Sequence, residues 1–133
     1  MSMFKSETFL RNVLLLDAAS GIIGGLLFIL AAGPLSALLA MPAEFLRGAG
    51  AVLLPFAGFV LWAATCQPIQ AKAVWIIVGL NAVWIIESVA LLFGNWIAPN
   101  GLGTAVVLGQ AAAIAVIAEL EIIGLRSRAA QPA

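Results

Sequence analysis

The chain has 133 residues, of which 64% are apolar, and it carries only six Lys or Arg and six Asp or Glu residues. A soluble domain reaches about 45–50% apolar residues with glycine included, so this composition excludes a water-soluble enzyme and indicates a protein surrounded by lipid. The zero net charge argues against nucleic-acid binding, and one cysteine with no histidine excludes intramolecular disulfides and His-based sites. We expect no catalytic residue, metal site or cofactor.

Four apolar stretches are long enough to cross a bilayer, which takes about 20 helical residues. Because the joints between them are short, we predict an all-α polytopic membrane protein, a single domain (residues 1–126) built as an antiparallel four-helix bundle. The first stretch is too long for a signal peptide and is interrupted by Asp17. The predicted spans are residues 12–32, 45–65, 73–93 and 102–125, and residues 127–133 are predicted to be disordered.

Basic residues are distributed unevenly between the two sides of the predicted membrane. Only Arg47 falls on the side of the first and third joints, so the positive-inside rule predicts cytoplasmic termini. Trp62 and Trp75 are then expected at the inner interface and Trp96 at the outer one. The five basic residues on the terminal side are Lys5, Arg11, Lys72, Arg126 and Arg128.

The first outer joint, residues 33–44, is less polar than an ordinary loop. Its leucines recur near helical spacing, which predicts a short interfacial helix that ends before Pro42. The second span is then expected to begin with Glu44 and Arg47 on one face of its first turn. Pro55, at the middle of that span, predicts a kink because proline cannot donate its backbone hydrogen bond.

Small residues form one stripe in the first predicted span and another in the fourth. Asp17 shares its face with Gly21 and Gly25, so it is expected to point at a partner helix. A hydrogen-bonding role for Asp17 is favoured over ion or proton coupling, which stays open. The stripe of the fourth span predicts a tight bundle or a tight oligomer, and it consists of Ala105, Gly109 and Ala113.

The third span carries a polar face. Asn81, Trp84 and Ser88 lie within about 60° of one another on a helical wheel, with Glu87 about 60° further round. Glu87 is the deepest ionisable group, and Gln110, at about the same depth, or Asn81 is its predicted partner. The indole N–H of Trp84 is expected to find its acceptor in Glu87 or Asn81.

Two further carboxyls, Glu119 and Glu121, lie near the end of the fourth span. They are predicted to form a solvated rim, where Arg126 pairs with Glu121. Arg11 and Lys72 are close enough in depth to pair with the carboxyls of this layer.

Five short segments of the chain carry a resemblance: residues 16–21 (LDAASG), 47–50 (RGAG), 53–55 (LLP), 81–84 (NAVW) and 120–125 (LEIIGL). Through them the chain resembles a widespread group of small uncharacterised bacterial integral membrane proteins. That resemblance implies a bacterial inner-membrane location but no activity.

Two functions follow from the residues. The favoured one is a non-catalytic four-helix module that self-associates or joins a larger membrane complex. The alternative is a small proton-coupled transporter that works as a dimer, with Asp17 or Glu87 as the coupling carboxylate, an architecture similar to that of the small multidrug resistance exporters.

Overall fold

The structure, a computed structural model, describes residues 2–94 and 98–129, with side chains for residues 7–94 and 98–127. Over these residues every element is a helix. All but the second are long and apolar enough to cross a membrane, which confirms the predicted all-α fold with four membrane helices. The helices are α1 (Ser2–Leu30), α2 (Ala32–Leu39), α3 (Ala43–Thr65), α4 (Ala71–Phe93) and α5 (Gly101–Ala129).

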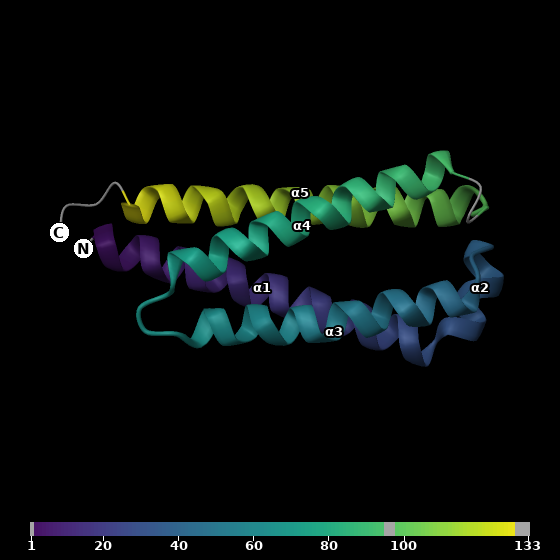
Figure 1. Ribbon diagram of the computed structural model, residues 1–133, viewed down its shortest axis with the longest axis horizontal. Coiled ribbons are helices and arrows are strands. Elements are labelled where there is room, and N and C mark those ends of the chain that lie inside the picture. Colours follow the sequence, from purple (N-terminus) through teal and green to yellow (C-terminus); the bar gives the residue numbers. More distant parts are fainter. Residues whose placement is uncertain (1, 95–97, 130–133) are drawn as a thin grey trace.

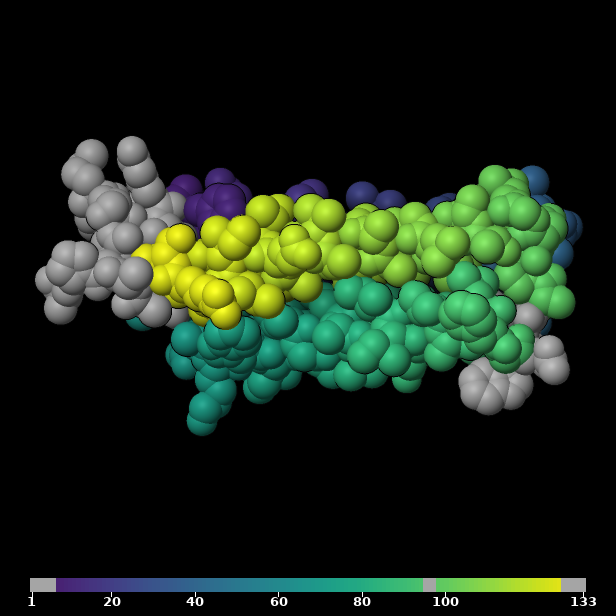
Figure 2. All heavy atoms as spheres, turned by 90° about the horizontal axis from the view of Figure 1, so that it is seen from above, coloured from purple at the N-terminus to yellow at the C-terminus, as the bar shows by residue number. Residues whose placement is uncertain are grey.

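The four long helices form an elongated bundle in which both termini lie at one end and α2 lies at the other (Figure 1). Helix α1 packs against α3 and α5, and α4 packs against α5. Figure 2 shows α4 and α5 side by side along the bundle. Helices α3 and α4 are consecutive in the chain but pack only sparsely, and α4 diverges from α3 toward the end that holds α2 (Figure 1). The side between α3 and α4 is therefore the least tightly packed.

The helices extend beyond the predicted spans at several ends, most of all at the start of α1, which begins at Ser2 rather than at residue 12. Helix α1 ends at Leu30, and Pro34 lies in the first turn of α2, where a missing backbone N–H costs little. Helix α5 continues to Ala129, past the predicted end at residue 125, because the polar residues beyond the apolar stretch still form helix readily. Residues 130–133 of the predicted tail, and Trp96, lie outside the described residues.

The short helix predicted between the first two spans is present as α2, and it is bonded to the start of α5. It ends at Leu39 and is followed by Ala40, whose backbone is left-handed with φ 56°. The side chain of Asn100 donates to the carbonyl oxygen of Leu38 at 2.9 Å, and its Oδ1 accepts the backbone N–H of Gly103 at 2.8 Å. The side chain of Asn100 therefore both caps α5 and joins it to α2.

Helices α1 and α3 approach closely where their small residues meet. A Cβ placed on Gly21 would lie 3.0 Å from Cβ of Ala57, and one on Gly50 would lie 2.6 Å from the carbonyl oxygen of Gly25. Such distances leave no room for a side chain. The small-residue stripe of α1 is therefore used within the chain, against α3.

The outer surface of the bundle is apolar. Leu30 is 79% exposed and Phe93 is 86% exposed, as expected for side chains that face lipid. Helix α3 continues through Pro55, which is exposed. At the start of α3 the predicted pairing is present, because Arg47 donates to the carboxylate of Glu44.

Candidate functional site

A buried polar cluster joins α1, α4 and α5. Nδ2 of Asn81 donates to Oδ2 of Asp17 at 3.1 Å and to Oε1 of Glu121 at 3.2 Å. The three residues are 3%, 6% and 0% exposed, respectively. One amide nitrogen thus uses both of its hydrogens to hold two carboxyl groups. Asp17 points at a partner helix as expected, but that helix is α4, whereas Gly21 and Gly25 face α3.

The placement of Glu121 corrects the prediction of a solvated rim. Glu119 is exposed, but Glu121 is fully buried. Helix α5 runs two turns beyond Glu121, and the face that Glu121 shares with Ile117 and Gly124 packs inward. A Cβ on Gly124 would lie 3.0 Å from Leu10 of α1. No sequence signal separated the two faces, because the neighbours of Glu119 one turn away on α5 are apolar as well.

Arg11 lies away from this cluster, which corrects the predicted pairing with its carboxyls. Its guanidinium donates to the carbonyl oxygens of Ala64 at 2.8 Å and Cys66 at 2.7 Å, with Glu7 at 4.0 Å. These carbonyls end α3, where helical acceptors lack partners and the helix dipole attracts a cation. Among the described side chains, no Lys or Arg forms an ion pair with Asp17 or Glu121.

The electrostatics of the cluster are therefore unbalanced. Two like charges held by one nitrogen atom repel each other by a few kcal/mol, on the order of the roughly 4 kcal/mol expected at 4 Å for an effective dielectric constant of about 20. One neutral amide cannot offset two ionised carboxyls buried in the bundle. In addition, Oε2 of Glu121 is buried and has no hydrogen-bond partner.

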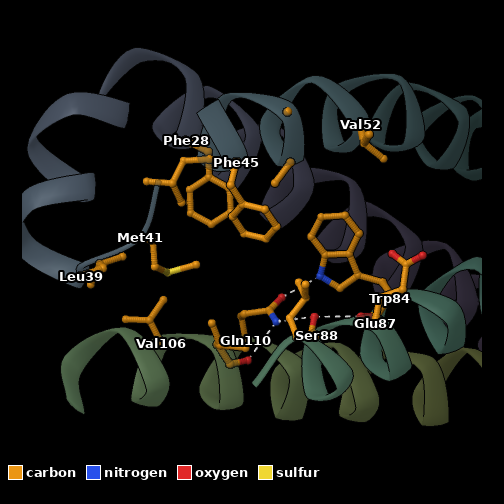
Figure 3. Close-up of a pocket in the computed structure, with 15 residues that line it drawn as sticks. Phe28, Leu39, Met41, Phe45, Val52, Trp84, Glu87, Ser88, Val106 and Gln110 are labelled. Carbon is orange, nitrogen blue, oxygen red and sulfur yellow. Dashed lines mark hydrogen bonds between the residues drawn. The ribbon is translucent and has the colours of Figure 1, made fainter. Parts of the chain in front are cut away.

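A second polar group lies further along α4, beside α5. Nε1 of Trp84 donates to Oε1 of Gln110 at 2.8 Å, and Nε2 of Gln110 donates to Oγ of Ser88 at 3.0 Å (Figure 3). Neither Glu87 nor Asn81 accepts from the indole of Trp84, so both predicted acceptors were wrong. The predicted pairing of Gln110 with Glu87 was wrong as well. A carboxamide accepts and donates at once, so it serves an indole and a hydroxyl together, which an ionised carboxylate cannot do.

Glu87 stands apart from both polar groups. Its side chain is exposed, and it forms no hydrogen bond or ion pair with any described residue. Figure 3 shows it beside Trp84 at the edge of a cavity. An unpaired ionised carboxyl within a membrane helix is costly, up to about 2.5–3.5 kcal/mol at the helix centre on insertion scales, and Glu87 lies within α4 between its centre and its end.

Two cavities adjoin along the side of the bundle between α3 and α4. One has a volume of about 340 Å³ and reaches Met41 and Phe45 near α2. The other has a volume of about 430 Å³ and reaches Asp17 and Asn81. We call the two together the lateral groove, and their sizes suit small organic ligands. Both cavities are lined by Phe28, Val52, Trp84, Glu87 and Gln110.

The small-residue stripe of α5 is largely open. Ala105 and Gly109 are exposed, and a Cβ on Gly109 would meet no atom within 4 Å. Ala113 is also exposed and borders the second cavity. Within the chain this stripe therefore does not form the close helix contact that Gly21 and Gly25 form.

Comparisons of the chain with protein-family models, with curated proteins and with solved structures found no match. Within residues 7–94 and 98–127, no group of three or more His, Cys, Asp or Glu side chains is placed to hold a metal ion. The lateral groove and its polar groups are the features from which a function is argued.

Proposed function

We propose that this protein is a non-catalytic bacterial inner-membrane protein whose lateral groove binds an apolar organic cation, with Glu87 as the opposite charge. The observation that carries the proposal is the unpaired, exposed carboxyl of Glu87 on the wall shared by both cavities. A bound cation would offset the cost of that carboxyl within the membrane.

The lining of the groove favours such a ligand. Phe28 and Phe45 supply aromatic, apolar walls. The indole of Trp84 lies next to Glu87, and a cation between them gains from the ring face as well as from the carboxylate. Arg47, the basic residue on this half of the bundle, is already paired with Glu44. Charge complementarity therefore selects a cation over an anion.

This proposal develops the transporter alternative, for which binding in the groove is the first step. A four-helix chain encloses little volume, so transport would require a second copy or a change of packing between α3 and α4, the least tightly packed side. The positive-inside rule supports cytoplasmic termini, and both termini lie at one end of the bundle (Figure 1).

The test measures binding of tetraphenylphosphonium to the purified protein in lipid nanodiscs. We expect saturable binding that Glu87→Gln weakens by at least about tenfold, or about 1.4 kcal/mol, because the counter-charge is removed. Triphenylphosphine oxide, a neutral molecule of related shape, should bind the parent and Glu87→Gln equally. Empty nanodiscs correct for partition into lipid.

Glu119→Gln is the matched control, since it also neutralises one exposed carboxyl in a membrane helix but lies outside the groove. It should bind tetraphenylphosphonium like the parent. Equal affinities in the parent and in Glu87→Gln, or no saturable binding by the parent, would rule out Glu87 as the counter-charge.

A second candidate function is self-association, which the open stripe of α5 favours. Gly109 and Ala105 present a flat, small-residue surface to the outside of the chain. In lipid such surfaces let two helices approach closely, and the resulting van der Waals contact drives association. The protein would then act as a self-assembling membrane module, alone or within a larger complex.

A further inference from the structure

The buried cluster of Asp17, Asn81 and Glu121 differs in chemistry from the binding site proposed in the lateral groove. It brings two carboxyls onto one amide nitrogen, at 3.1 and 3.2 Å, from three different helices. All three residues are at least nine-tenths buried. Oε2 of Glu121 has no hydrogen-bond partner, and a buried polar atom without a partner destabilises the folded protein.

We infer that this cluster is a proton-binding site, in which Asp17 and Glu121 together hold one proton while the amide of Asn81 donates to both carboxyl groups. A proton on either carboxyl removes one of the two like charges, and a neutral Glu121 leaves its unpartnered Oε2 at a smaller cost than an ionised Glu121 does. The inference is independent of what the groove binds.

The surrounding helices supply no alternative compensation. On α1, Arg11 is occupied by the carbonyls of Ala64 and Cys66. On α4, Lys72 is exposed at the helix start and Glu87 is exposed in the groove. Arg11 and Lys72 therefore form no ion pair with the cluster, and Glu87, which lines the same cavity as Asp17, carries no positive charge.

The other elements agree. On α5, Glu119 and Arg126 are exposed. The part of α3 that packs against α1 presents Ala57 and Val60, which are apolar. A proton is therefore the cation that the described residues leave room for.

The proton also has a route to the cluster. Asp17 and Asn81 line the second cavity of the lateral groove, which reaches Glu87. Water that enters this cavity would contact the carboxyl of Asp17, so the site can exchange its proton without separation of the helices. Binding at the cluster and binding in the groove are thus adjacent events.

The test is infrared spectroscopy of the full-length protein in nanodiscs, which detects the carbonyl stretch of protonated carboxyl groups. At neutral pH we expect this band in the parent, and its loss or marked reduction in Asp17→Asn and in Glu121→Gln. Glu119→Gln should retain the whole band. Glu87→Gln identifies any contribution of Glu87, so the band lost at the cluster is assigned separately.

A second measurement protects the test against misfolding. The amide introduced by Glu121→Gln can donate as a protonated carboxyl does, so this variant should fold and its thermal midpoint should be insensitive to pH. The midpoint of the parent should fall as the pH rises, because loss of the proton held by the cluster leaves two buried charges. Glu119→Gln should follow the parent.

Two outcomes would overturn the inference. One is a parent spectrum whose carboxyl band is absent or is unchanged in both cluster variants. The other is a carboxyl band that disappears in sodium chloride but not in choline chloride, together with a thermal midpoint that sodium raises in the parent but not in Glu121→Gln. That result would assign the cluster to a sodium ion. Failure of tetraphenylphosphonium binding would leave these results unaffected.

Discussion

Gln110 shows how one uncharged side chain connects two membrane helices. Its carboxamide accepts from the indole of Trp84 on α4 and donates to Ser88, one turn further along the same helix. Both bonds lie beside the groove, where water is scarce and an unpaired donor is costly. The side chain of Gln110 therefore fixes the orientation of the Trp84 ring, which we propose contacts the bound cation.

Gln110→Leu is expected to lower the thermal midpoint of the protein, because it leaves the indole N–H of Trp84 without an acceptor at a cost of about 1–3 kcal/mol. Circular dichroism in detergent measures the midpoint, and tryptophan fluorescence reports the change around the ring. Gln70→Leu, at an exposed position, is the control and should leave both unchanged. Identical melting of the two variants would show that the Trp84–Gln110 bond has no stabilising effect.

At the scale of the elements, the pairing of α1 with α3 depends on backbone contact. Gly50 lies against the backbone of Gly25, and Gly21 lies against Ala57, so close packing holds these helices together along this stretch. Polar bonds between them are formed by Arg11, at the end of α3. The α4–α5 pair is different, since the Gln110 bonds connect it. The two helix pairs meet chiefly where α1 packs on α5.

Gly25→Leu should destabilise the chain itself, because a Cβ at this position would lie 2.9 Å from the side chain of Leu54. Overpacking of this kind costs about 1–3 kcal/mol. Thermal unfolding in detergent is the measurement, with Gly58→Leu as the control, since Gly58 lies in α3 with open space around it. The assignment fails if Gly25→Leu and Gly58→Leu unfold at the same temperature.

At the scale of the whole molecule, the two small-residue stripes have different roles. The stripe of α1 packs against α3 of the same chain, whereas that of α5 remains on the surface at Gly109. A stripe left open in a folded protomer is available to another protomer.

Gly109→Leu should therefore weaken self-association and leave the fold intact, because the added side chain separates the two α5 surfaces. Light scattering coupled to size exclusion in detergent gives the protomer number, and circular dichroism checks the fold. Gly79→Leu, another position with open space, serves for comparison. An unchanged protomer number in Gly109→Leu would eliminate this face as the interface.

Much of the architecture follows from the sequence, because length and apolarity alone define the four membrane helices and α2. The inward direction of Asp17 was also predictable, since lipid does not tolerate an unpaired carboxyl. The burial of Glu121 was not, because almost every face of α5 is apolar or small and hydrophobic periodicity then fails to mark the inner face. The partner of Gln110 likewise depends on how α4 and α5 are rotated against each other, which no local pattern encodes.

The sparse packing between α3 and α4 has a consequence for how a ligand would arrive. A cavity that opens sideways is supplied from the bilayer, so the membrane acts as the reservoir and the solute's partition coefficient sets its effective concentration. Occupancy would then rise with lipophilicity even among compounds that make identical contacts with Glu87. An apparent affinity referred to the aqueous phase would change with the amount of lipid in the assay.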